Sequence, residues 1–214
     1  MKPRLQLNSI KLVYSLGVVL LVGAITSALL ATDPRWVNWH FSRLGEGGTI
    51  PAMIFNMFLL ISAVIFFSIG LALKADFTRI SDVGNINLKT AKNVICGAFF
   101  AVGICFVGVA FLTFDRFPVA HNIFGYSILI SFVALLFLVP KVLPIFSRRF
   151  YIYNYLIIFS ATISYTLFFF AKVITMLSVE FLMFIQIYVW ILLLNQGICK
   201  RCNQKPLRDE KLSV

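Results

Sequence analysis

The sequence contains few charged residues and few acids in particular. Of 214 residues, 13% are charged and eight are acidic, whereas 60% are hydrophobic. Ordinary globular chains contain about 25% charged and about 45–50% apolar residues. This composition excludes an ordinary soluble domain and indicates a protein embedded in a bilayer. The formal charge of +11 does not indicate nucleic-acid binding, because most basic residues flank the ends of apolar runs, as the positive-inside rule describes.

Cysteine is also scarce, and its positions exclude the disulfide framework of a small secreted domain. Cys96 and Cys105 fall inside an apolar run, and Cys199 and Cys202 flank the last such run. The Cys-x-x-Cys spacing of the second pair would suit half of a zinc site or a redox pair, but a second such pair is missing. We therefore interpret these residues as reduced thiols or a lipidation site.

Common catalytic motifs are missing as well. The sequence has only two histidines, and it contains no His-x-x-x-His, no His-Glu-x-x-His and no Gly-x-Ser-x-Gly. Two histidines are too few for the zinc site of the seven-helix membrane hydrolases related to alkaline ceramidase and the progestin receptors. No cofactor is assigned from the sequence, and a zinc ion bound by both histidines and two carboxylates is kept as an alternative.

What the sequence has in abundance is long apolar runs. A spanning helix needs about 20 apolar residues, and six stretches meet this length. They predict an all-α, six-helix integral membrane bundle as one domain, residues 1–199, followed by a basic cytoplasmic tail, residues 200–214. The first run is longer than the core of a signal peptide and is expected to be retained. The predicted helices cover residues 12–31, 52–73, 94–114, 123–143, 153–174 and 178–198.

The distribution of charge predicts the orientation. Most of the 19 lysines and arginines fall in the two termini and in the second and fourth loops. Only Arg35, Arg43 and Arg116 lie in the first and third loops, with Lys172 near the fifth. The positive-inside rule therefore places both termini in the cytoplasm, and we expect a bacterial cytoplasmic membrane protein whose partners are lipids or another membrane protein.

This orientation gathers titratable groups on the outer face. His40 and His121, the residues that titrate near neutral pH, both fall there. The inner two-thirds of the six apolar runs contain no Asp, Glu, Arg or His, which argues against an ion-coupled transporter. Asn122 is expected to cap the fourth helix, and an ion pair is expected between Lys172 and Glu180. The candidate binding residues of the first loop, the third loop and the last helix are His40, Ser42, Arg43, Glu46, Arg116, His121, Asn122 and Glu180.

Two short motifs resemble a known family. Asn38-Trp-His-Phe-Ser-Arg-Leu-Gly45, followed by Ile54-Phe-Asn-Met, is similar to the "Ser-x-Leu-Gly … Phe-Asn" signature of bacterial six-helix membrane proteins known as domain of unknown function 998. Phe117-Pro-Val-Ala-His-Asn122 resembles that family's "Phe-Pro … His-Asn" motif. The topology is loosely similar to the Frag1/DRAM/Sfk1 proteins. The resemblance implies the six-helix architecture and no established activity. The positions that carry it are Ser42, Leu44, Gly45, Asn56, Pro118, His121 and Asn122.

Three functions are compatible with these features. The leading one is binding of a lipid, an envelope intermediate or a partner protein through residues 32–51 and 115–122. The second is an enzyme acting on an envelope lipid, with His121 as base, Asp115 or Glu46 as orienting carboxylate, and His40 or Ser42 assisting. A small-solute transporter is the third. Trp36 and Trp39 are expected in an interfacial aromatic belt. Asn56 and Asn154 are expected to hydrogen-bond between helices or to cap helix ends.

Overall fold

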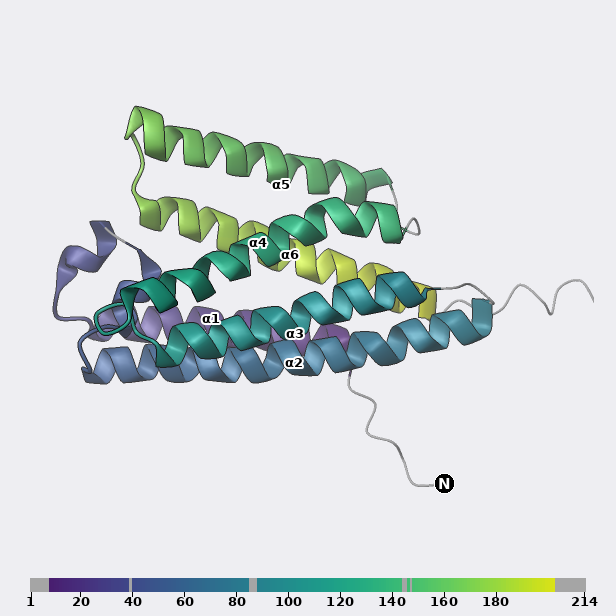
Figure 1. Ribbon diagram of the computed structural model, residues 1–214, viewed down its shortest axis with the longest axis horizontal. Coiled ribbons are helices and arrows are strands. Elements are labelled where there is room, and N and C mark those ends of the chain that lie inside the picture. Colours follow the sequence, from purple (N-terminus) through teal and green to yellow (C-terminus); the bar gives the residue numbers. More distant parts are fainter. Residues whose placement is uncertain (1–7, 39, 85–87, 144–145, 147, 203–214) are drawn as a thin grey trace, which may run out of the picture.

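The computed structural model describes residues 8–38, 40–84, 88–143, 146 and 148–202, and in this part of the chain six long α-helices and no strand are found. Each helix is long and apolar enough to cross a membrane, so the prediction of an all-α six-helix membrane bundle is confirmed (Figure 1). The helices are α1 (Ser9–Leu30), α2 (Ile50–Gly84), α3 (Lys89–Phe111), α4 (Pro118–Val142), α5 (Arg148–Thr166) and α6 (Met176–Cys202).

Successive helices run in opposite directions, so the bundle has two distinct poles (Figure 1). At the loop pole lie residues 31–38, 40–49, 112–117 and 172–175. At the opposite pole, which we call the basic pole, α1 begins, α6 ends with Lys200 and Arg201 in its last turn, and α5 begins with Arg148 and Arg149. Both ends of the described chain therefore lie on the same side of the bundle. That this side is the cytoplasmic one stays a prediction.

The loop between the second and third helices is much shorter than predicted. The predicted helices leave residues 74–93 as a loop, but α2 continues to Gly84 and α3 begins at Lys89. Phe77 and Ile80 are buried along this extension, in line with the buried Leu73 just before it. Their spacing of three to four residues keeps one apolar stripe facing the core. Hydropathy averaged over the polar and the apolar face of the helix conceals this stripe.

The fourth helix also begins earlier than predicted. Its first residue is Pro118, and a proline fits there because the first N–H groups of a helix have no intrahelical partner. Asn122 therefore lies one turn inside α4, where it is exposed. The prediction that Asn122 caps this helix is wrong, since Phe117 occupies the N-cap position and makes no side-chain cap.

The core lies where α2 and α3 pack against α1, α4 and α6. Phe66 of α2 contacts Phe99 and Phe106 of α3 and Phe132 of α4, with ring centroids 5.0 to 6.4 Å apart. Helix α5 packs chiefly on α6 and lies at the edge of the bundle (Figure 1). Its side chains Tyr155 and Phe159 are each 65% exposed, as expected of a lipid-facing surface.

A polar network attaches α5 to its two neighbours. Pro140 lies inside α4 and has no N–H, so the carbonyl of Leu136, four residues earlier, loses its usual helical donor. The Asn154 side chain of α5 donates to this carbonyl at 2.7 Å, and Trp190 Nε1 of α6 donates to Asn154 Oδ1 at 3.0 Å. The prediction that Asn154 hydrogen-bonds between helices is confirmed, and its carbonyl partner exists because of a proline.

Candidate functional site

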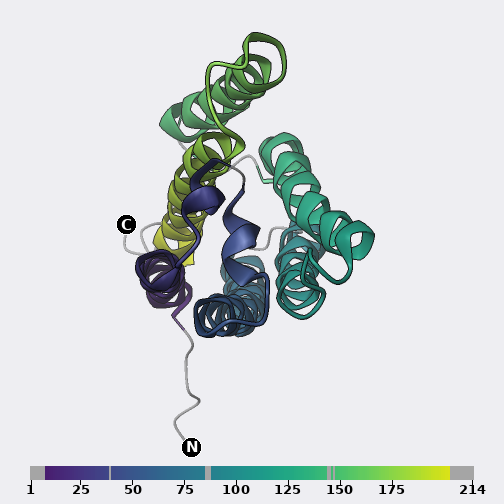
Figure 2. The ribbon, with the colours of Figure 1, turned by 90° about the vertical axis from the view of Figure 1, so that its left-hand side faces the viewer.

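The first loop folds over the loop pole as two short 3-10 helices, η1 (Pro34–Asn38) and η2 (Phe41–Gly45). Figure 2 shows both lying across the end of the bundle. The chain then turns through Gly47 and Gly48, whose φ angles are 78° and 62°. Residues with a Cβ atom rarely adopt positive φ, so the two glycines allow the chain to reverse into α2.

Asn56 holds the end of η2 against α2. Its side-chain Nδ2 donates to the carbonyl of Gly45 at 3.0 Å. A Cβ atom on Gly45 would lie 2.5 Å from Asn56 Oδ1, so a larger residue does not fit this contact. Asn56 therefore forms a hydrogen bond as expected, but with the first loop and not with another membrane-spanning helix, and the contact gives a physical reason for the pairing of Gly45 and Asn56 in the sequence motif.

Asp115 joins the third loop to the first. Its Oδ2 accepts a hydrogen bond from Gly47 N at 3.3 Å. Hydrogen bonds from the Thr113 side chain and from the backbone, together with the charge of Arg116, hold the pKa of Asp115 below its usual value. The two loops that the sequence suggested as parts of one site therefore do meet, with an ionised carboxylate at the junction.

Glu46 is paired with Arg43 of the same loop. Arg43 Nη1 lies 3.4 Å from Glu46 Oε2, and the Glu46 side chain is only 13% exposed. Burial raises the pKa of Glu46, the Arg43 charge opposes this shift, and Asp115 adds to it. Within the described part of the chain, Oε1 of Glu46 is enclosed and has no hydrogen-bond partner.

His40 and Ser42 form a hydrogen-bonded pair in the same loop. His40 Nδ1 lies 2.7 Å from Ser42 Oγ. Burial, followed by the neighbouring charges of His121 and Arg43, lowers the pKa of His40. The ring is therefore neutral at neutral pH, and one of its nitrogens accepts a hydrogen bond.

His121 is buried and fastens α4 to the end of α3. It is 5% exposed, and its Nδ1 lies 2.8 Å from the carbonyl of Leu112, the C-cap residue of α3. A carbonyl can only accept, so Nδ1 is the donor. The Phe114 ring contacts both histidines edge to face, at 5.4 Å from His40 and 5.9 Å from His121. The histidines are thus near one another, with Phe114 in contact with both.

Glu180 connects the last helix to the first loop. Its Oε2 accepts from Phe41 N at 2.7 Å, and Phe41 stacks on Phe181 with centroids 6.3 Å apart. The expected ion pair with Lys172 is wrong, because both residues are described and no such pair joins them. Lys172 is exposed and ends the π-helix η3 (Leu167–Ala171) with a φ of 54°.

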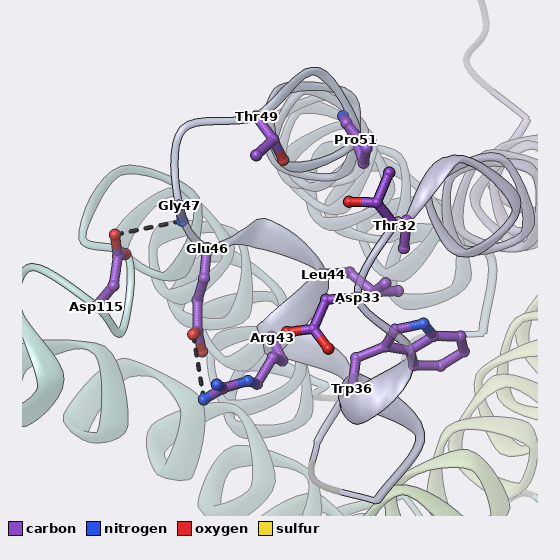
Figure 3. Close-up of a pocket in the computed structure, with 11 residues that line it drawn as sticks. Thr32, Asp33, Trp36, Arg43, Leu44, Glu46, Gly47, Thr49, Pro51 and Asp115 are labelled. Carbon is purple, nitrogen blue, oxygen red and sulfur yellow. Dashed lines mark hydrogen bonds and ion pairs between the residues drawn. The ribbon is translucent and has the colours of Figure 1, made fainter.

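A cavity of about 290 Å³ opens at the loop pole, between the end of α1, η1, η2 and the start of α2 (Figure 3). Small-molecule sites usually measure about 300–1,000 Å³, so this cavity is of the size of a head group or a small solute. Figure 3 shows the Arg43 guanidinium turned toward Glu46, with Asp33 between Arg43 and Trp36. The lining residues are Ala31, Thr32, Asp33, Trp36, Arg43, Leu44, Glu46, Gly47, Thr49, Pro51 and Asp115.

Only some of the predicted site residues line this cavity. Arg43, Glu46 and Asp115 do so, whereas the other candidates, His40, Ser42, Arg116, His121, Asn122 and Glu180, lie outside its wall. Asp33 was not among the predicted binding residues, and Trp36 was predicted only as part of an interfacial aromatic belt. The sequence signal that could have identified both residues is their position just after an apolar run, on the same predicted side of the membrane as Glu46. Trp39 lies outside the described residues.

The titratable side chains do not converge on a metal site. In residues 8–38, 40–84, 88–143, 146 and 148–202, no three His, Cys, Asp or Glu side chains are close enough to hold a metal ion. The predicted alternative of a zinc ion bound by two histidines and two carboxylates is therefore not assembled in this part of the chain.

Comparisons with known proteins add no relative: no family model, no curated protein and no solved structure matches this chain. The resemblance to the domain of unknown function 998 family stays a prediction that rests on its short motifs.

Proposed function

We propose that this integral membrane protein binds the polar part of a membrane-associated ligand, such as a lipid head group or an envelope intermediate, in the cavity of the loop pole. The observation that carries the proposal is a cavity of about 290 Å³ lined by Asp33, Arg43, Glu46 and Asp115 at the end of a bundle of six apolar helices. Such a position brings charged groups to the depth at which lipid head groups lie.

The architecture of the loop supports binding by a preformed surface. Asn56 holds Gly45, Asp115 holds Gly47, and Glu180 holds Phe41, each by a hydrogen bond from or to the loop backbone. Three different helices or loops thus fix the cavity wall before any ligand arrives. Preorganisation of this kind reduces the entropy lost on binding.

Filling the cavity tests the proposal. Thr32 is exposed and lines the cavity, so Thr32→Trp should occupy part of its volume. Thr90→Trp places the same side chain at an exposed position in the first turn of α3, at the basic pole, and is the matched control. We expect native mass spectra of the detergent-purified protein to show a retained lipid or metabolite that is lost in Thr32→Trp and kept in Thr90→Trp. Equal ligand retention in both variants and the unaltered protein would contradict the proposal.

A second candidate function is acyl transfer from a membrane lipid, favoured by the 2.7 Å contact between His40 Nδ1 and Ser42 Oγ. Here Ser42 Oγ would attack an ester carbonyl while His40 takes its proton and returns it to the departing alcohol, and water would then cleave the acyl-serine. Incubation with phospholipid vesicles tests it. Release of free fatty acid that disappears in Ser42→Ala and His40→Gln supports catalysis. Release that Ser42→Ala leaves unchanged contradicts it.

A further inference from the structure

We propose that the cavity of the loop pole selects a ligand that carries an ammonium group. This inference rests on the proposed binding function and specifies its ligand class. The wall contains three carboxylates, Asp33, Glu46 and Asp115, and one guanidinium, Arg43. An excess of negative side chains around an enclosed space attracts a cation and repels an anionic head group.

The environment of Glu46 supplies an independent observation. Its Oε2 faces Arg43 at 3.4 Å, but in the described chain its Oε1 is enclosed and accepts no hydrogen bond. An enclosed carboxylate oxygen without a donor is costly, roughly 1–3 kcal/mol or more, and such atoms usually have a partner. Glu46 lines the cavity, so a modest movement of its side chain would bring Oε1 within reach of one of the three N–H donors of an ammonium group.

The arrangement favours an organic cation over a bare metal ion. No three acidic, histidine or cysteine side chains of the described residues converge on one point, so the negative charge is distributed around the wall. The Trp36 indole forms part of that wall (Figure 3), and indole is the side chain that attracts organic cations most strongly through its ring face.

The rim of the cavity fits the rest of a zwitterionic head group. Arg116 is exposed, and its Nη2 lies near Gly48, at 4.0 Å from where a Cβ atom would stand. A phosphate next to the ammonium group could therefore meet a guanidinium outside the acidic wall. Two sources share this chemistry, namely the head group of phosphatidylethanolamine and a free amine such as ethanolamine or its phosphate.

A lipid titration tests the inference. The purified protein in detergent micelles is titrated with phosphatidylethanolamine, phosphatidylglycerol, ethanolamine or phosphoethanolamine, and binding is followed by thermal shift and native mass spectrometry. We expect an ammonium-bearing ligand to bind at least about tenfold more tightly than phosphatidylglycerol, which corresponds to about 1.4 kcal/mol. Binding of the lipid alone identifies a head group, and equal binding of the soluble amines identifies a free amine.

Charge-removing variants identify the partner of the ammonium group. Glu46→Gln keeps the size of the side chain and should remove most of the preference, whereas Asp82→Asn, at an exposed acid near the other end of α2, should leave it unchanged. Equal or tighter binding of phosphatidylglycerol by the unaltered protein would refute the inference, and this comparison does not depend on folding of a variant. An unchanged preference in Glu46→Gln would also refute it. If the unaltered protein binds both lipids equally and Thr32→Trp weakens the binding of both, only the ammonium preference fails. If it weakens neither, the proposed function fails with it.

Discussion

Substitution of Asn154 by leucine tests whether the polar network of α4, α5 and α6 arises from Pro140. Leucine has a similar size but cannot hydrogen-bond, so the carbonyl of Leu136 and the N–H of Trp190 would both lose their partner. Side-chain hydrogen bonds between membrane helices contribute about 0.6 kcal/mol on average and up to about 1.7. We therefore expect Asn154→Leu to lower the free energy of unfolding by roughly 1–3 kcal/mol.

The same substitution should cost less when Pro140 is replaced by alanine. Pro140→Ala restores a backbone N–H that can donate to the carbonyl of Leu136, so only the Trp190 bond remains to be lost. The expected coupling between Asn154→Leu and Pro140→Ala is roughly 0.6–1.5 kcal/mol, whereas independent sites add within about 0.3–0.5 kcal/mol.

Reversible unfolding in mixed micelles, followed by circular dichroism and by tryptophan fluorescence, measures this double-mutant cycle. Ser127→Ala is a suitable control, because among the described residues its hydroxyl donates to the Ile123 carbonyl of the same helix, and we expect less than about 0.5 kcal/mol of change. If Asn154→Leu costs the same with and without Pro140, the carbonyl freed by the proline is not what Asn154 stabilises, and the reasoning is refuted.

Two further predictions concern the loop pole and its surroundings. Gly48→Ala should destabilise the protein by about 1–2 kcal/mol, because alanine is strained at positive φ. Gly97→Ala should instead stabilise it by about 0.5–1 kcal/mol, because a Cβ atom at Gly97 meets nothing within 4 Å. Thermal melts of both variants in detergent measure the two effects, and equal effects would contradict the argument from backbone conformation. The lowered pKa of His40 means that the unfolded chain binds more protons than the folded one between that pKa and about 6.5, so stability should fall as the pH is lowered through this window. His40→Gln should flatten this part of the profile of melting temperature against pH, and an unchanged slope would show that another group titrates there.

The number and type of the helices were accessible from the sequence because each apolar run is longer than a bilayer core requires. The helix ends were less accessible where polar and apolar residues alternate. The segment from residue 74 to residue 84 carries charges on one side and Phe77 and Ile80 on the other. The average hydropathy of this segment therefore predicts a loop. Only the directions of the individual side chains show that it continues the helix.

The candidate site was predicted in part. The two loops were expected to meet, and Gly47 and Asp115 show that they do. Roles for His121 and Glu180 could not be predicted, because both depend on backbone groups far along the chain or in another element. Leu112 offers a carbonyl at the end of α3, and Phe41 offers an N–H in η2, and neither group has a signature in the sequence.

The sequence by itself determined a six-helix membrane bundle and the grouping of titratable residues beside the first and third loops, since both follow from transfer of apolar and charged groups between water and lipid. Only the tertiary structure decided which of these residues share a cavity. It placed Asp33 and Trp36 with Glu46, and left His40 and His121 outside the wall. The physical reason is that a cavity forms where backbone turns and helix ends fail to close the space between them, and that depends on hydrogen bonds such as those of Asn56 and Asp115 rather than on residue type.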